Sequence, residues 1–328
     1  MLNVLEQNMR GGETIMIQIL ELFGGIGSPR IALRNLGVPV KAIDYVEIDE
    51  KAVRSYNAMF KNELVYKTQS VVGYNLKPDI LIHGSPCQDF SIAGKQKGAD
   101  EGTETRSSLM WETIHIIQQM GVWKPRVVIW ENVKNVLSKH MVANFTRYLN
   151  EMEKMGYTNN FEILNAMDFG LPQKRERVFT ISMLDGTFFN FGTLEKKKPP
   201  HIREFLEDTE DEQYIITAPS MLERIGKKKG NFNGKLEIID SFCTTITTKQ
   251  NRNPNSGVID LKDGRYRYLT EKECWRLQGY SDEDFKAALK AHPGKPGKLN
   301  GALYKQAGNS IPVPIFEAIF KQLLDLSV

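Results

Sequence analysis

The stretch "IQILELFGGIGS", residues 17–28, joins an apolar run to a glycine-rich turn and to the start of a helical segment. The run "IQILELF" has the length and the apolar content of a β-strand. The glycines that follow allow a sharp turn in which the backbone approaches a ligand closely. A strand, a glycine turn and a helix in this order are typical of the first unit of an α/β domain.

The alternation of short strands with helical segments continues to about residue 185. Between the strands, residues 107–120 place apolar side chains at helical spacing, which indicates a helix packed on the sheet. We therefore expect an α/β fold with a doubly wound, mostly parallel sheet, in which ligands bind beyond the carboxyl ends of the strands. The other strand-length runs are residues 41–47, 79–84, 126–131 and 177–183.

The length and composition are those of a soluble globular protein. A chain of 328 residues that is 41% hydrophobic can bury a full core and carry a second, smaller lobe. No apolar run reaches the roughly 18 residues that a membrane span needs, and the first residues lack the pattern of a signal peptide. We expect a cytoplasmic protein without a membrane partner.

The cysteines and histidines do not form a metal-binding pattern. Three cysteines, at positions 87, 243 and 274, and five scattered histidines lack the paired spacing of a zinc site, and an odd number of cysteines does not suit a disulfide framework. We expect no metal. Each thiol is ordinarily a small buried apolar side chain, and only Cys87 has surroundings that argue for another role.

Positive charge is concentrated in loops. The formal net charge of +3 is too small to indicate a polyanionic partner by itself. Basic clusters, however, recur in segments rich in glycine, proline or asparagine, where lysine and arginine side chains suit contacts with phosphate. These clusters are "GKQK" (94–97), "QKRER" (173–177), "KKK" (196–198 and 227–229) and "KQNRN" (249–253).

Two features favour a cofactor that contains adenosine. The glycine turn follows a strand, and Glu47 ends the next strand about 20 residues later, where a ribose hydroxyl would need an acceptor. Ser28, Pro29 and Arg30 stand where a dinucleotide-binding turn would have its third glycine. A nicotinamide cofactor is therefore disfavoured.

Chemically reactive side chains follow the third and fourth strands. Cys87 precedes a long polar loop that contains three glycines, which is the setting of a nucleophile that admits a large substrate and then excludes water. Glu131 ends the apolar run "VVIWE", and at the carboxyl edge of a sheet such a carboxyl group can act as a proton donor.

Six motifs in one order give the chain its resemblance to a known family. They are "ELFGGIGSPR" (21–30), "SPCQDFS" (85–91), "WENV" (130–133), "QKRERVF" (173–179), "RYLTEKECWRLQGY" (267–280) and "KQAGNSIPVPI" (305–315). In these motifs the chain resembles the cytosine-C5 DNA methyltransferases of prokaryotes and phages, from about Ile17 to its end. The resemblance implies a Rossmann-like methyltransferase fold with a smaller target-recognition lobe.

The resemblance also implies a reaction. The enzyme would transfer a methyl group from S-adenosylmethionine to C5 of a cytosine that is flipped out of a specific short sequence of double-stranded DNA. Cys87 would attack C6 and form a covalent adduct, which makes C5 nucleophilic. Glu131 would bond to N3 and the exocyclic amine, Arg177 would lie near O2, and Arg175 would support the same pocket or a phosphate.

The family pattern assigns the cofactor site residue by residue. One position departs from the family: Ser70 and Val71 stand where many members have an aspartate followed by an apolar residue. A serine brings no charge, so we expect adenine recognition that is weaker or that uses the backbone. The expected cofactor-binding residues are Phe23, Gly25, Ile26, Gly27, Glu47, Ile48, Ser70, Val71 and Asn309.

Contacts with DNA are expected from two regions. The loop after the nucleophile would close on the DNA, and a stretch without family motifs, residues 186–243, has the position of the target-recognition region. In it, the basic segment 227–235 is the better candidate for the DNA groove than the acidic run 204–212. The expected DNA-binding residues are Ser85, Gln88, Ser91, Lys95, Lys97, Arg106, Lys229, Asn233 and Arg252.

The order of the motifs predicts two domains. Residues 1–185 and 290–328 would form the catalytic domain, because the last helical segment, residues 314–326, has the apolar spacing of a core helix. Residues 186–289 would form the target-recognition domain. We expect a monomer, which in a restriction-modification system would be accompanied by a cognate restriction endonuclease.

Two other functions are compatible with the same scaffold. The first is a cytosine-C5 methyltransferase that acts on transfer RNA, but the RNA-directed branch carries a Cys-Phe-Thr tripeptide where this chain reads "SFCTTIT" (241–247). The second is a catalytically silent DNA-binding regulator. Every catalytic position of the family pattern holds the expected catalytic residue in this chain, which disfavours this second function.

Overall fold

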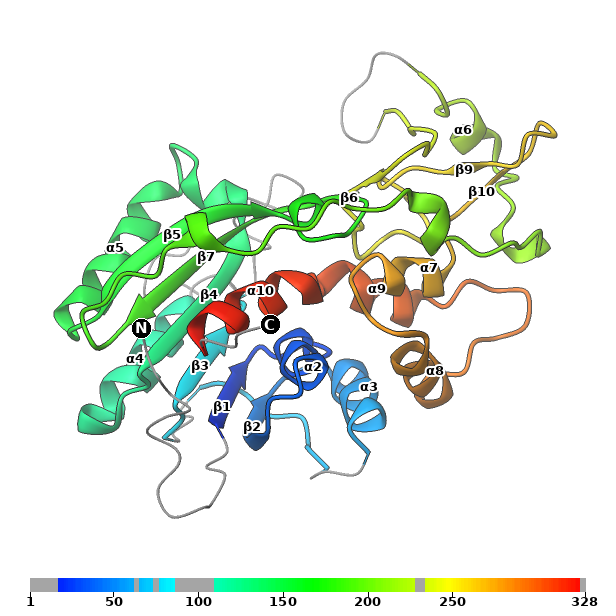
Figure 1. Ribbon diagram of the computed structural model, residues 1–328. Coiled ribbons are helices and arrows are strands. Elements are labelled where there is room, and N and C mark those ends of the chain that lie inside the picture. The colour runs from blue at the N-terminus through cyan, green and yellow to red at the C-terminus, as the bar shows by residue number, and fades with distance from the viewer. Residues whose placement is uncertain (1–16, 62–64, 73–76, 86–108, 228–233, 325–328) are drawn as a thin grey trace.

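A six-stranded sheet forms the centre of the computed structural model, which describes residues 17–61, 65–72, 77–85, 109–227 and 234–324 (Figure 1). The strand order is β2-β1-β3-β4-β7-β5, and the first four strands in this order are parallel, whereas β7 is antiparallel to both of its neighbours. The expected mostly parallel α/β sheet is thereby confirmed. The strands are β1 (Ile17–Leu22), β2 (Val40–Val46), β3 (Ile80–His83), β4 (Val127–Val133), β5 (Thr158–Asn165) and β7 (Glu176–Met183).

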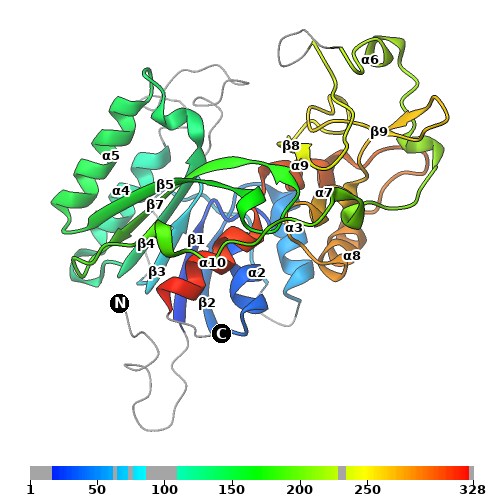
Figure 2. The same ribbon diagram turned by 45° about the horizontal axis from the view of Figure 1, so that its top comes forward.

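Helices cover both faces of this sheet because both faces of its central strands are apolar (Figure 2). In β1, Ile17 and Ile19 pack into one core and Leu20 and Leu22 into the other, as the two-residue period of a strand requires. The first core includes α2 (Ser28–Asn35), α3 (Glu50–Met59) and α10 (Val313–Leu323), and the second includes α4 (Leu109–Gln119) and α5 (Val142–Lys154).

The carboxyl-terminal helix α10 returns to the large domain, as its apolar spacing predicts. Its side chains Ile315, Phe316, Ile319 and Phe320 are fully buried in the first core, and the Phe316 ring contacts that of Phe179 on β7 edge to face. The end of the chain therefore completes a domain that the first strand begins.

A second, much smaller core lies outside the large domain, at the upper right of Figure 1. It consists of Ile216, Leu236, Val258 and Tyr268. Around it lie α6 (Pro219–Leu222) and the antiparallel pair β9 (Ile259–Asp260) and β10 (Tyr266–Arg267). We call residues 214–268 the small lobe.

The helices that follow the small lobe pack on the first core of the large domain. They are α7 (Glu271–Arg276), α8 (Asp282–Ala291) and α9 (Gly301–Asn309). Trp275, Phe285 and Leu303 are their main contributions to that core. The predicted division at residues 186 and 289 stays a prediction, but the separate apolar core lies entirely within the small lobe.

Short elements connect these parts. The two-residue strands β6 (Gln173–Lys174) and β8 (Cys243–Thr244) pair in parallel. Single 3-10 turns occupy Gly121–Trp123, Lys134–Leu137, Ala166–Asp168, Phe191–Thr193, Ile202–Phe205 and Glu212–Tyr214.

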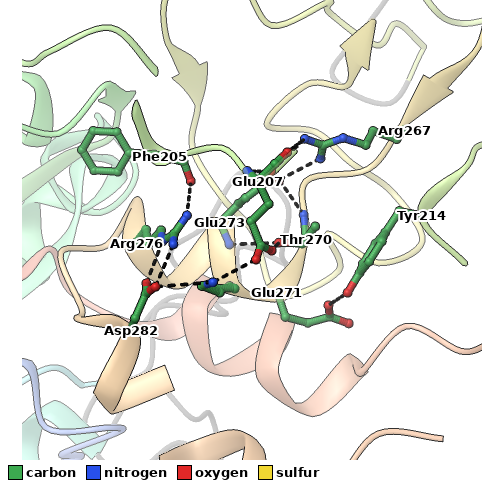
Figure 3. Close-up of polar contacts among 10 residues, drawn as sticks. Phe205, Glu207, Tyr214, Arg267, Thr270, Glu271, Glu273, Arg276 and Asp282 are labelled. Atoms are coloured by element: carbon green, nitrogen blue, oxygen red, sulfur yellow. Dashed lines mark hydrogen bonds and ion pairs between the residues drawn. The ribbon is translucent and has the colours of Figure 1, made fainter. Parts of the chain in front are cut away.

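A polar network braces the small lobe against α7 (Figure 3). The buried carboxylate of Glu273 accepts bonds from both terminal nitrogens of Arg267, at 2.8 and 2.9 Å, and from the backbone N–H of Glu207 and Thr270. Glu207 belongs to the acidic run 204–212, and its own carboxylate accepts a bond from the Thr270 hydroxyl. This part of the acidic run therefore fixes the chain that enters the lobe.

Candidate active site

The carboxyl ends of the four parallel strands meet at one edge of the sheet, where the expected site residues gather. Strand β1 leads into the glycine turn, β2 into Glu47, and β3 into Gly84 and Ser85, while Glu131 lies near the end of β4. Because parallel strands all point the same way, residues far apart in the sequence line a single edge.

The glycine turn is pressed against aromatic rings on its inner side and is open on its outer side. Gly27 has φ 78°, and a Cβ there would lie 2.5 Å from the ring of Tyr56, so no other residue fits without displacing that ring. Gly25 has φ 54°, and a Cβ there would meet no atom within 4 Å. The outer surface of the turn is therefore free to receive a ligand, while Ile26 is buried beneath it.

Glu47 holds this turn in place. Its carboxylate accepts bonds from the backbone N–H of Gly25 at 2.9 Å and from those of Ile48 and Asp49 at 2.8 Å each. Beside it, the side chain of Ile48 is 72% exposed, which is unusual for an aliphatic residue. The Glu47 carboxylate thus joins the glycine turn to the end of β2, and the exposed apolar side chain of Ile48 lies next to it.

The other expected cofactor residues lie in different surroundings. Phe23 is half-buried at the start of the turn, with φ 55°. Ser70 is exposed, and its hydroxyl accepts a bond from the backbone N–H of Val72, whereas Val71 is buried in the second core. Asn309 is exposed at the end of α9.

Glu131 and Arg177 form a nearly buried ion pair. Arg177 Nε lies 3.1 Å from Glu131 Oε1, and the two side chains are 14% and 12% exposed. Burial raises the pKa of Glu131, although the positive charges of Arg177 and Arg175 act in the opposite direction. A Cβ on Gly84 would lie 3.6 Å from Glu131 Oε2. This carboxyl group therefore lies beside the end of β3, one residue before the motif "SPCQDFS" (85–91) begins.

Ser85 and Arg175 make their polar contacts inside the protein. Ser85 is 4% exposed, and its hydroxyl accepts a bond of 3.1 Å from Trp130 Nε1. Arg175 is 2% exposed and donates to the backbone carbonyls of Ile246, Gly308 and Ser310. Both side chains therefore connect segments that surround the site.

The remaining sequence-predicted residues divide into two groups. Arg252 is exposed in a turn of the small lobe, where its backbone N–H donates to the Lys249 carbonyl. The role of Arg252 in binding DNA stays a prediction. The expected residues that lie outside the described part of the chain are Cys87, Gln88, Ser91, Lys95, Lys97, Arg106, Lys229 and Asn233.

Several residues at the site were not predicted from the sequence. Tyr45 donates from its hydroxyl to the Gly25 carbonyl at 2.5 Å. Ser28, Tyr280 and Ser310 join their hydroxyls at 2.7 to 3.1 Å and so connect the first motif with the last two. Single tyrosines and serines carry no spacing signal, and only the membership of Ser28, Tyr280 and Ser310 in the quoted motifs could have indicated these three residues.

Beneath the turn, Glu21 is a buried acid. Its Oε2 accepts a bond of 2.8 Å from the Tyr56 hydroxyl, to which Arg30 also donates. Among the described residues its Oε1 has no hydrogen-bond partner. Burial is the main cause that raises the pKa of Glu21 to about 7, and the Arg30 charge opposes that shift.

This buried acid predicts a pH-dependent stability. A folded-state pKa raised from 4.5 to about 7 means that the native protein holds a proton that the unfolded chain releases, so stability falls as the pH rises between these values. Glu21→Gln should remove this fall and stabilise the protein at pH 8 by roughly 3 kcal/mol. Denaturant unfolding from pH 4 to 8 measures it, with the exposed Glu223→Gln as control. Parallel profiles of wild type and Glu21→Gln would contradict the assignment.

A second prediction concerns Glu47. Removing its carboxylate by Glu47→Ala frees three backbone N–H groups, and we expect the affinity for S-adenosylmethionine to fall roughly 10- to 100-fold. DNA affinity should change far less. Calorimetry with the cofactor measures this. The control is Glu50→Ala, three residues beyond Glu47, which removes a carboxylate from an exposed pair with Arg54. Unchanged cofactor affinity in Glu47→Ala would exclude Glu47 from the site.

The described residues contain neither a membrane-spanning helix nor a metal-binding cluster. None of the helices within residues 17–324 that the structure describes combines the length and apolarity needed to cross a membrane. Likewise, the described side chains contain no group of three or more His, Cys, Asp or Glu residues suited to a metal ion.

Comparisons with known proteins identify the family of the chain. A family model of the C-5 cytosine-specific DNA methylases matches residues 17–325. Type II methyltransferase M2.ScrFI of Lactococcus lactis subsp. cremoris is 32% identical over 94% of this chain and 99% of its own length. Type II methyltransferase M.Bsp6I of Bacillus sp. (strain RFL6) is 31% identical over 94% of this chain and 100% of its own length.

Solved structures share the fold. The methyltransferase EhMeth of Entamoeba histolytica superposes with a TM-score of 0.73 at 20% identity, covering 95% of this chain and 98% of that one. The Dnmt2 methyltransferase of S. pombe superposes with a TM-score of 0.72 at 21% identity, covering 94% and 98%. At these identities the likeness concerns the fold alone.

Proposed function

The chain belongs to the family of C-5 cytosine-specific DNA methylases and is a DNA (cytosine-5-)-methyltransferase, and from this premise we propose the course of its reaction. In our proposal the methyl group comes from S-adenosylmethionine, the substrate is a cytosine flipped out of a specific short sequence of double-stranded DNA, and the thiol of Cys87 forms a covalent adduct with it. The observation that carries the proposal is the nearly buried Glu131–Arg177 pair beside Gly84.

The residues at the glycine turn fit S-adenosylmethionine. The open space outside Gly25 allows a ligand to lie against the backbone. Glu47 supplies a carboxylate for ribose hydroxyls, and the exposed Ile48 supplies an apolar surface for the adenine ring. Phe23 and Asn309 would complete the site. When bound, the cofactor supplies an electrophilic methyl group for C5.

The first step is proposed for the thiolate of Cys87, two residues beyond Ser85 in the sequence. Its sulfur forms a bond to C6 of cytosine, the electron pair of the C5–C6 double bond becomes a C4–C5 double bond, and the pair of the C4–N3 double bond moves onto N3. Ser85 is held by Trp130 and follows Gly84, which lies beside Glu131, and this position of the described chain two residues before Cys87 supports the proposal.

Glu131 is proposed to give a proton to N3 as this charge develops. Burial raises the pKa of this carboxyl group above its ordinary range, against the opposing charges of Arg177 and Arg175, and a higher pKa favours the protonated form that can act as a proton donor. The ion pair with Arg177 orients the carboxyl group and places a positive charge beside the base pocket, where it can stabilise the cytosine O2.

The reaction ends with one elimination, in which C5 loses its proton and C6 loses the sulfur. After methylation, C5 carries both the methyl group and a proton, and the electron pair left by that proton restores the C5–C6 double bond and expels the sulfur of Cys87 as a thiolate. We assign no side chain as the base for this proton and propose water. N3 returns its proton to Glu131. The product is 5-methylcytosine in DNA, and the free thiolate can enter another cycle.

Recognition of DNA is proposed to involve the loop after Cys87 and the small lobe. Flipping costs a few kcal/mol, which protein contacts have to offset, and the loop residues Gln88, Ser91 and Arg106 are proposed to make such contacts. Lys95 and Lys97 would contact phosphates. In the recognition region, Lys229, Asn233 and the exposed Arg252 are proposed as the base-reading residues.

We further propose that the enzyme acts as a monomer alongside a cognate restriction endonuclease. The similar proteins described above carry type II names, which supports this setting. DNA from cells that express the protein would be methylated at one short sequence, so that an endonuclease of the same specificity could not cut it.

The proposed function is tested by methyl transfer in vitro. The purified protein is incubated with methyl-labelled S-adenosylmethionine and either duplex DNA of mixed sequence or transfer RNA. We expect label in DNA alone, recovered as 5-methylcytosine. Label in transfer RNA alone would favour the RNA-directed alternative, and DNA binding without any transfer would favour a silent regulator.

A further inference from the structure

Arg175 lies where two distant segments of the chain meet. Its Nη1 donates to the carbonyl of Ile246 at 2.9 Å, and its Nη2 donates to the carbonyls of Gly308 and Ser310 at 3.0 and 2.8 Å. The side chain is 2% exposed. One planar guanidinium therefore joins Ile246, a small-lobe residue whose side chain packs in the first core, to the last turn of α9 and to Ser310 beyond it.

Gln173, two residues earlier, strengthens the same junction. Its side chain accepts a bond from the Ile246 N–H at 3.1 Å and donates to the Leu277 carbonyl at 2.8 Å. Strand β6, which contains Gln173, also pairs with β8. Gln173 and Arg175, both in the motif "QKRERVF" (173–179), thus bond to the backbone N–H and the backbone carbonyl of Ile246 respectively.

The two segments also touch directly. A Cβ on Gly308 would lie 2.3 Å from the backbone nitrogen of Thr248 and 2.4 Å from the backbone carbon of Thr247. No side chain can be accommodated there without moving one backbone away from the other. A shift of the 246–248 segment is therefore transmitted to the end of α9.

Each segment continues into a different binding region. The end of α9 carries Asn309, assigned above to the cofactor, and the next residue, Ser310, bonds to Ser28 behind the glycine turn. On the other side, Thr244 bonds through its backbone and hydroxyl to residues 255 and 256, which lead directly into Val258 of the small-lobe core.

We propose that Arg175 is a positioning residue that couples the cofactor site to the small lobe, so that cofactor binding and DNA binding strengthen each other. This inference rests on the proposed function. A cofactor that fixes the 308–310 segment also fixes Ile246 through Arg175, and the small lobe then meets DNA in a more restricted orientation, which lowers the entropic cost of binding. Linkage requires the same factor in both directions.

The test measures this factor in Arg175→Lys. Lysine keeps the charge but lacks the fork that reaches three carbonyls. The probes are S-adenosylhomocysteine and a labelled duplex that carries the target sequence. Sequencing the methylated cytosines in DNA from cells that express the protein first identifies that sequence. In the wild type we expect each ligand to tighten the other roughly 5- to 150-fold. In Arg175→Lys the factor should fall to about 1 to 2, and both directions should agree.

Two further variants make the result specific. Gly308→Ala should also lower the coupling factor, because the added Cβ separates the same two backbones while Arg175 is retained. If Arg175→Lys does not fold, Gly308→Ala provides the test instead. Arg267→Lys is the matched control. Arg267 is equally buried and also donates to backbone carbonyls, but within the brace of Figure 3, so its factor should stay that of the wild type.

A wild-type factor in folded Arg175→Lys and Gly308→Ala would overturn the inference. A factor of one in the wild type would do the same. Either result can occur while the wild type transfers methyl groups to DNA normally, so that only the coupling is refuted. If the wild type instead transfers none to any duplex, the proposed function itself has failed, whatever the coupling factor is.

Discussion

Cys87→Ser is expected to lower methyl transfer to duplex DNA by roughly 10³-fold or more. A serine hydroxyl ionises far less readily than a thiol and is a much weaker nucleophile near neutral pH, so attack on C6 would become too slow to support turnover. Single-turnover assays with labelled S-adenosylmethionine measure the effect on chemistry separately from product release.

Binding should be preserved in this variant, because the change from sulfur to oxygen is small. We expect DNA and cofactor affinities within about threefold of wild type, a difference of less than roughly 1 kcal/mol. Cys243→Ala is the matched control: it removes a fully buried thiol in β8 and should retain the wild-type mechanism. Substantial turnover by Cys87→Ser would contradict the covalent mechanism.

Glu131→Gln should lower the maximal rate by roughly 10²- to 10⁴-fold, the usual contribution of a positioned general acid. Glutamine keeps the size of the side chain and can still bond to the base, but it has no proton to transfer to N3. We expect the loss in kcat to exceed any change in KM. Steady-state kinetics over a range of duplex concentrations separate these two terms.

The pH profile gives a second readout on Glu131. The acid must be protonated to act, and its raised pKa extends the active range to higher pH than an exposed glutamate would allow. The wild-type rate should therefore decline on the alkaline side as Glu131 ionises, and Glu131→Gln should lack that decline. As control, Glu176→Gln alters a neighbouring exposed carboxylate that pairs with Lys134. The same alkaline decline in Glu131→Gln would assign it to another group.

Strands β3 and β4 could be predicted because they are buried on both faces. The run predicted at residues 79–84 is observed as β3, Ile80–His83, and the run at 126–131 as the first part of β4. Such continuous apolar runs bounded by polar residues are strong signals. The helix predicted near the end of the chain is likewise α10, whose apolar face is fully buried.

Strand β5 was not predicted, and its sequence explains why. "TNNFEILN" is largely polar, and most of its side chains are only partly buried. The reason is that β5 lies at the edge of the sheet, where β7 is its one neighbouring strand. An edge strand needs no continuous apolar run. Its pairing with β7 spans residues 158–183 and depends on contacts that no local pattern records.

At the candidate site, sequence motifs identified the ionisable side chains better than the backbone groups and aromatic rings that hold them in place. Glu131 and Arg177 were expected together and form an ion pair. The three carbonyls that Arg175 bonds come from residues at positions 246, 308 and 310, and backbone acceptors leave no trace in the sequence. The aromatic rings beneath the glycine turn likewise look like ordinary core residues until the tertiary packing brings them there.

The central claim, methyl transfer to cytosine C5 through Cys87, is tested most directly with a duplex in which 5-fluorocytosine replaces the target cytosine. Fluorine at C5 cannot leave as a proton does, so the enzyme should stay bonded to the DNA after methylation. We predict a denaturant-resistant complex whose mass equals protein plus duplex plus one methyl group, with the attachment mapped to Cys87, and none with Cys87→Ser. Efficient methylation of the ordinary duplex without any covalent complex on the fluorinated one would contradict the account.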